Sequence, residues 1–158
     1  KKLVDDIIGS DDIIRFFLIP GDNGADCLTI LLPSGRKLYY INPSIGQNEW
    51  GRPSISYMGM DQKTKRWKRI ETYGGKLVEN CVQAIARDCL AASIDRLEAA
   101  KLPVVFHVHD EVVIDVAPFA DEDTMLSTVC SIMGEPVPWA PDLPLKAAGW
   151  VGYYFTKD

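Results

Sequence analysis

Several features that mark specialised protein classes are missing from this sequence of 158 residues. The longest unbroken apolar runs, such as Val104 to Phe106 and Val112 to Ile114, are far shorter than the roughly 18 residues that a membrane helix needs. The opening Lys1-Lys2-Leu3 is not followed by the apolar core and cleavage site of a signal peptide. There are no low-complexity segments or internal repeats. We therefore expect a globular domain with no membrane contact, and the missing initiator methionine suggests a piece of a longer polypeptide.

Cysteine and histidine are also scarce. The four cysteines show no Cys-x-x-Cys spacing, and Cys81 and Cys89 fall on an apolar helical pattern, where free thiols pack as small hydrophobic groups. This usage favours a reducing, cytoplasmic setting. His107 and His109, with Asp110, match the His-x-His-x-Asp pattern of zinc hydrolases incompletely, so ordinary strand histidines are favoured over zinc ligands.

An excess of positive charge is missing as well. The sequence has 17 basic and 22 acidic residues and a net charge of −5, unlike most free-standing nonspecific nucleic-acid binders. The charges are nevertheless segregated along the chain. The cations of one short stretch are Lys63, Lys65, Arg66, Lys68 and Arg69, and a later acidic group comprises Asp110, Glu111, Asp115, Asp121, Glu122 and Asp123. Such a division is expected where one part of a protein contacts phosphates and another holds a divalent cation.

Hydrophobic periodicity and turn residues predict an α+β fold with an antiparallel sheet and packed long helices. Hairpins are expected where two β-prone runs flank a short turn, over residues 27–41, 54–73 and 104–116. A long helix is expected from Lys76 to Ala100, stopped by Pro103, and a second from Asp121 to about Met133. The remaining expectations are a helix within residues 1–17 and short strands over 145–150 and 153–155.

The turn of the last hairpin carries His109-Asp110-Glu111, although tight hairpins normally turn on a glycine-containing pair. Two interpretations remain open. Aspartate is a common turn residue, so the triplet could be an ordinary polar turn. Alternatively, Asp110 and Glu111 are ligands for Mg²⁺, which prefers carboxylate oxygens and completes its shell with substrate phosphates.

The segment Val108-His109-Asp110-Glu111-Val112-Val113-Ile114 resembles motif C of the family A DNA polymerases. Gly35-Arg36-Lys37-Leu38-Tyr39 resembles an element that precedes the last palm helix of that family, and the stretch from Tyr73 to Asp88 resembles that helix in phage-type members. The resemblance covers about residues 28–158. It implies that residues 27–158 are the C-terminal part of a polymerase palm and that residues 1–26 are a remnant of the fingers-proximal segment.

The resemblance also implies roles for individual residues. Asp110 matches the carboxylate that coordinates two catalytic Mg²⁺ ions, and Glu111 matches the adjacent carboxylate. His109 would lie near the primer terminus, and Gln83 would contact the minor groove of the nascent duplex. The basic residues Arg36, Lys37, Lys65 and Arg66 are further candidates for contact with the DNA backbone, although cations around Lys65 could equally protect a hairpin edge from aggregation.

Motifs A and B of that family have no convincing match in this sequence. We therefore expect a fragment of a DNA-directed DNA polymerase, inactive alone, whose parent acts on primer-template DNA and deoxynucleoside triphosphates in a bacterial cell as a phage or prophage product. The rest of the parent chain would supply motifs A and B. The alternatives are a stand-alone metal-dependent phosphohydrolase and a noncatalytic DNA-binding module.

Overall fold

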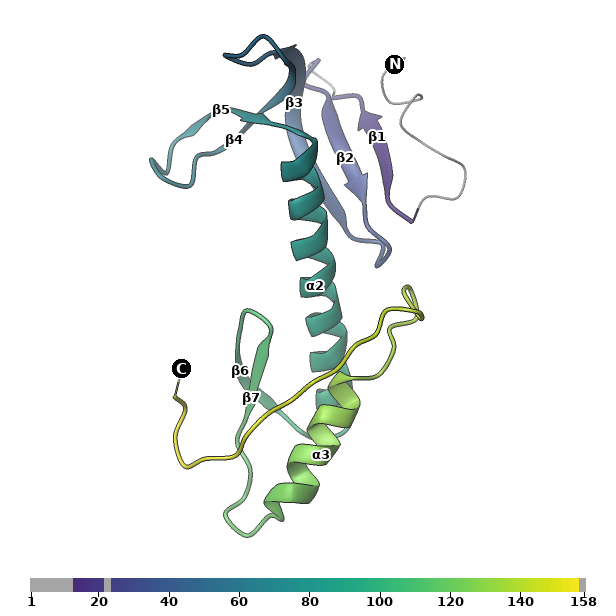
Figure 1. Cartoon of the computed structure of the whole chain (residues 1–158), viewed down its shortest axis with the longest axis vertical. Helices are drawn as coiled ribbons and strands as arrows, with labels where there is room; N and C mark the ends of the chain where they lie inside the picture. Colours follow the sequence, from purple (N-terminus) through teal and green to yellow (C-terminus); the bar gives the residue numbers. More distant parts are fainter. Residues whose placement is uncertain (1–12, 22–23, 157–158) are drawn as a thin grey trace. The chain divides into compact units, whose positions relative to one another are not determined.

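The computed structural model describes residues 13–21 and 24–156, which fall into two compact units, Lys1–Ala84 and Ile85–Asp158. Every strand pair in both units is antiparallel, and both units contain part of a long helix (Figure 1). The predicted α+β class with an antiparallel sheet is confirmed. The expectation of several long helices is wrong, because the described residues contain one helix of 26 residues and one of 12.

The first unit contains a five-stranded sheet whose spatial order follows the sequence. Its strands are β1 (Arg15–Ile19), β2 (Cys27–Leu31), β3 (Lys37–Gln47), β4 (Pro53–Met60) and β5 (Trp67–Thr72). The hairpins predicted over residues 27–41 and 54–73 are confirmed. Because β3 also pairs with β4, the structure joins them into one continuous sheet.

Strand β1 corrects the sequence-based expectation for the start of the chain. Residues 15–17 were expected to be helical, yet Arg15–Ile19 pairs along its whole length with β2, with Phe16 opposite Ile30. Phe16, Phe17 and Ile19 are residues that favour strands, and pairing with β2 satisfies the backbone groups of the segment. The rest of that predicted helix lies outside the described residues.

Strand β3 is irregular where it meets β4. The register shifts between Ile41 and Ser44, and Asn42 in this interval has a φ of 50°, a left-handed conformation that asparagine tolerates. Arg69 braces the irregularity, because its Nη1 donates hydrogen bonds to the carbonyl of Asn42 at 3.2 Å and to Oγ of Ser56 at 3.1 Å. Bulges increase local strand twist. Beyond this point the far end of the β4–β5 hairpin extends away from strands β1–β3 (Figure 1).

Helix α2 (Gly74–Ala99) matches the predicted long helix to within two residues at each end. In the first unit it buries Leu77, Cys81 and Ala84, which recur at the spacing of four and three that aligns side chains along one helix face. Asn80 of this helix donates a hydrogen bond from Nδ2 to the hydroxyl of the buried Tyr40 at 3.0 Å. The first unit is therefore held together by one face of the helix and the side of the sheet that carries Tyr40.

The second unit combines the rest of α2 with the hairpin β6 (Val104–Val108) and β7 (Glu111–Ile114) and with helix α3 (Glu122–Met133). Its buried apolar side chains are Cys89, Leu90, Leu97 and Val137. Arg96 ties the connection after α3 to α2, because its Nη atoms donate to the carbonyls of Glu135 and Pro136 at 2.8 and 2.7 Å. The hairpin and both helices were predicted, and their presence is confirmed.

The predicted strands over 145–150 and 153–155 are wrong. These residues are irregular in the structure, and no described strand pairs with them. A β-prone run becomes a strand only where a partner satisfies its backbone groups. Separately, within residues 13–21 and 24–156 no helix combines the length and apolarity needed to cross a bilayer.

Candidate active site

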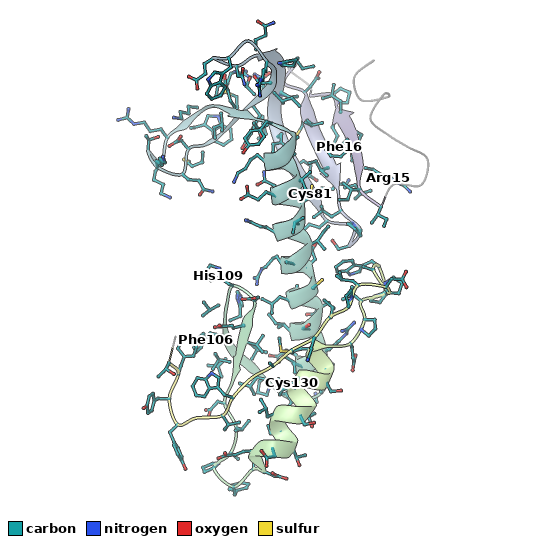
Figure 2. All side chains as sticks on the ribbon, viewed as in Figure 1. Arg15, Phe16, Cys81, Phe106, His109 and Cys130 are labelled. Atoms are coloured by element: carbon teal, nitrogen blue, oxygen red, sulfur yellow. The ribbon has the colours of Figure 1, made fainter. Side chains whose placement is uncertain are left out.

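The hairpin β6–β7 turns through only two residues, His109 and Asp110, because Val108 already pairs with Glu111. The predicted three-residue tip is therefore corrected, and Glu111 is the first residue of β7. Figure 2 shows His109 at the bend. His109 has a φ of 51°, whereas Asp110 is not among the residues of positive φ, so only the first turn residue has the backbone sign that glycine usually supplies in a tight hairpin.

Glycine is the residue that this turn position favours, since a side chain in the left-handed region costs about 1 kcal/mol or more. Histidine is one of the side chains that tolerate the conformation best, but it gives no advantage to the turn itself. The choice of His109-Asp110 is therefore not explained by hairpin stability. Strained turn residues of this kind are common at functional sites.

The two adjacent carboxylates are open to solvent. Asp110 and Glu111 are both exposed, and neither forms an ion pair with any residue that the structure describes. Their oxygens are thus free to bind a hard cation, and one or two carboxylates are a typical protein contribution to a Mg²⁺ site. The residues present fit Mg²⁺ in this respect. Within the described part of the chain, no three acidic, histidine or cysteine side chains cluster as a metal site.

A contact that the sequence analysis missed links this hairpin to helix α2. The Nη1 and Nη2 atoms of Arg87 lie 3.4 Å from Nδ1 and 3.2 Å from Nε2 of His107, so the guanidinium group faces both ring nitrogens. His107 lies on β6, two residues before the turn. The pair therefore anchors the strand that leads to Asp110. No sequence signal could have found it, because the partners are 20 residues apart and share no motif.

One side of the hairpin is apolar and incompletely covered. Val105 is 61% exposed, and Phe106 remains 41% exposed although its ring packs edge-on against Phe155, with centroids 5.2 Å apart. A two-stranded hairpin is only marginally stable by itself, so it depends on the elements that pack against it. Here those include α2, through Arg87, and the C-terminal segment, through Phe155.

The helix residue expected to contact DNA lies in the first unit. Gln83 is exposed on α2, and its Nε2 donates to Oε1 of Glu79 at 3.3 Å. The same carboxylate oxygen forms an ion pair with Nζ of Lys76 at 2.8 Å. This hydrogen-bonded pair raises the pKa of the Lys76 ammonium group above its ordinary value. Gln83 is therefore accessible to a ligand while part of a short surface network.

Arg36 and Lys37 begin the β3 side of the β2–β3 turn and have different surroundings. Nη2 of Arg36 donates to the carbonyl of Ala84 in α2 at 2.7 Å. Nζ of Lys37 lies 5.7 Å from the ring centroid of Phe17, within the range of a cation–π contact. Arg36 thus contacts the helix at the residue next to Gln83. No feature of the sequence indicated this structural contact.

Lys65 and Arg66 lie in the turn between β4 and β5, and both are exposed. The predicted site residues therefore form separate groups. His109, Asp110 and Glu111 share one hairpin of the second unit, Arg36 and Gln83 meet at α2 in the first unit, and Lys65 and Arg66 occupy another hairpin of the first unit.

Comparison with known proteins adds one informative match. The chain is 49% identical over 132 residues to a protein named DNA polymerase from Bacillus phage SP02, and the match covers 83% of this chain and 20% of that protein. The chain therefore spans about a fifth of the length of this relative. No family model matches the chain, and no solved structure does either.

Proposed function

We propose that this chain is the C-terminal part of the palm of a phage-type family A DNA polymerase, carrying one half of its two-metal nucleotidyl-transfer site. In this proposal Asp110 and Glu111 hold Mg²⁺, and the rest of a longer polypeptide supplies the second set of carboxylates. The substrates are primer-template DNA and deoxynucleoside triphosphates in the cytoplasm of the infected or lysogenic bacterium.

The observation that carries the proposal is the exposed Asp110-Glu111 pair at the end of a hairpin whose turn puts His109 at positive φ, within a chain 49% identical to part of a phage DNA polymerase. Identity of this degree over 132 residues supports a common fold and ancestry for the shared segment. The partly bare apolar side of β6–β7, at Val105 and Phe106, also suits a hairpin that packs against more of the polypeptide.

The chemistry follows from the residue types. When bound, Mg²⁺ would supply charge stabilisation for the attacking 3′-hydroxyl and for the departing pyrophosphate oxygens. The role of this chain is to present two carboxylates, one on a two-residue turn and one at the start of β7, and to hold β6 through the contact between Arg87 and His107. His109 would contact the primer terminus, and the exposed Gln83 would face the duplex.

Substitution of Asp110 tests the proposal in the full-length protein. Asp110→Asn keeps the size of the side chain but removes its charge, and we expect primer extension to fall by at least about a hundredfold. Glu111→Gln should have a smaller effect. Affinity for primer-template duplex, measured by fluorescence anisotropy, should stay within about twofold of the unmodified protein because phosphate contacts elsewhere provide most of the binding.

The matched control is Asp95→Asn, which removes one exposed carboxylate from α2 in the same unit. It should leave extension unchanged. Equal extension by the Asp110 and Asp95 variants would refute the proposal. Turnover of a simple phosphoester without template would instead identify a phosphohydrolase, and salt-sensitive DNA binding without extension by the unmodified protein would identify a noncatalytic module.

A further inference from the structure

The β4–β5 hairpin concentrates positive charge in an otherwise acidic chain. Its turn and the start of β5 contain Lys63, Lys65, Arg66, Lys68 and Arg69, against the single anion Asp61, while the whole chain has a net charge of −5. The far end of this hairpin extends away from strands β1–β3 (Figure 1). A projecting element with this charge attracts a polyanion at long range.

The structure separates the cations that hold the hairpin together from those that do not. Oδ1 of Asp61 accepts hydrogen bonds from the backbone N–H of Lys63 at 3.1 Å and from the N–H and hydroxyl of Thr64 at 2.7 and 2.9 Å. Oδ2 of Asp61 forms an ion pair with Nζ of Lys68 at 2.8 Å. These contacts lower the pKa of Asp61 far below its usual range, so it remains an anion that closes the turn.

Lys68 and Arg69 are therefore engaged within the sheet, Lys68 with Asp61 and Arg69 with β3 and β4. The side chains of Lys63, Lys65 and Arg66 are exposed and form no ion pair with any residue in the described ranges 13–21 and 24–156. Three cations are thus available at the end of a turn that is already rigid. Binding a ligand would cost little further ordering of the backbone.

An exposed aromatic side chain lies directly beside these cations. Trp67 follows Arg66 and is 55% exposed, and Met60, its partner across the strand pair, is 53% exposed. Protection of a sheet edge against aggregation explains lysines and arginines at this position, but it does not explain a solvent-facing tryptophan and methionine among them. Contact with duplex phosphates would likewise need only the cations.

We propose that the tip of the β4–β5 hairpin binds single-stranded DNA, with Trp67 stacking on an unpaired base and Lys63, Lys65 and Arg66 contacting the neighbouring phosphates. Cations combined with an exposed aromatic ring are the usual means of holding a strand whose base faces are free. The inference rests on the proposed polymerase function only for the choice of DNA as the polyanion. It adds a binding element for the unpaired strand, separate from Asp110.

The test uses the full-length protein and a fluorescein-labelled oligothymidylate of about 20 nucleotides, with binding measured by anisotropy between about 50 and 200 mM salt. Trp67→Ala should weaken binding about 5- to 150-fold, as for the loss of one stacked base. The triple variant K63Q/K65Q/R66Q should make the slope of log affinity against log salt shallower by about 2, the value for three lost phosphate contacts.

The matched control is Trp50→Ala, because Trp50 is 73% exposed in the connection between β3 and β4, at the opposite end of β4 from Met60. Trp50→Ala should bind within about twofold of the unmodified protein, and a blunt duplex should show no difference between the two tryptophan variants. Equal single-strand binding by both variants overturns the inference, as does an equal loss on the duplex. If Asp110→Asn retains extension while Trp67→Ala still loses single-strand binding, the proposed metal-site role of Asp110 fails and this inference stands.

Discussion

Arg36 offers a clear distinction between a structural role and a role in DNA binding. The sequence places it among the candidate DNA contacts, whereas in the structure its guanidinium donates to the carbonyl of Ala84 at 2.7 Å and so fastens the β2–β3 turn to α2. We expect Arg36→Gln to reduce the free energy of unfolding of the first unit. The glutamine is too short to maintain the same contact.

The size of the loss follows from the geometry. A hydrogen bond from a charged donor contributes about 1.5–3 kcal/mol, and the exposure of Arg36 favours the lower end of this range. The Ala84 carbonyl lies inside a helix, so its other lone pair continues to accept the intrahelical bond and no buried acceptor is left unpaired. We therefore expect a loss of about 1.5 kcal/mol, which corresponds to a fall of about 3–6 °C in Tm for a chain of this size.

Thermal unfolding followed by circular dichroism measures this loss, and Lys37→Gln is the matched control because it removes the same charge from the next residue. The contact of Lys37 with Phe17 is a single exposed cation–π interaction at 5.7 Å, near the limit of its range, so its removal should cost about 0.5 kcal/mol. Equal Tm values for the two variants would refute the structural role. If Arg36→Gln weakened primer-template binding at an unchanged Tm, the role of Arg36 would be DNA contact instead.

Two further predictions concern the hairpins. Because bonding to Lys68 and Thr64 lowers the folded-state pKa of Asp61, its contribution to stability is present above the unfolded pKa of about 3.9 and is lost as the pH falls below it. The difference in Tm between the unmodified protein and Asp61→Asn should therefore shrink steadily below about pH 4, and a pH-independent difference would contradict the assignment. Arg87→Met removes the contact with His107, so it should increase amide hydrogen exchange along β6 and β7 several-fold. Gln83→Ala, one helical turn earlier, should leave this exchange unchanged. Equal exchange in both variants would exclude a positioning role for Arg87.

The elements that the sequence predicted correctly are those with strong local signals. Helix α2 follows from apolar residues at three- and four-residue spacing and from Pro103, which prevents its continuation. The hairpins after β2 and β4 follow from turns that contain Gly35 or Asp61, residues whose backbone or side chain suits a tight turn. In these places local preference and tertiary structure agree.

The errors occur where pairing decides the outcome. The same kind of apolar, aromatic run became a strand in Arg15–Ile19, which has β2 beside it, and an irregular segment over 153–155, where no described strand lies alongside. A single sequence does not say which run finds a partner. The two-residue turn at His109-Asp110 was also beyond sequence analysis, because residue types alone do not fix where the pairing of two strands ends.

Candidate site residues were easier to identify than their contacts. Asp110 and Glu111 were proposed from their position between two apolar strands, and the structure describes both as exposed. The contacts of Arg36 with Ala84 and of Arg87 with His107 join segments 48 and 20 residues apart. Such long-range contacts depend on how the elements pack, and no local pattern encodes them.

The irregularity at Asn42 bears on the position of the basic tip of the β4–β5 hairpin, although Asn42 is not part of that tip. It lies opposite Ser56 to Met58 of β4 and is contacted by Arg69, and since bulges add twist we expect it to influence the direction in which the end of the β4–β5 hairpin leaves the sheet. The direction of the basic tip would then depend on one residue in a left-handed conformation, Asn42, opposite the last residues of β4 before the turn. A β-branched residue at position 42 would resist this conformation. We expect it to change the direction of the hairpin tip, and so the position of its cations, without altering any of the basic residues.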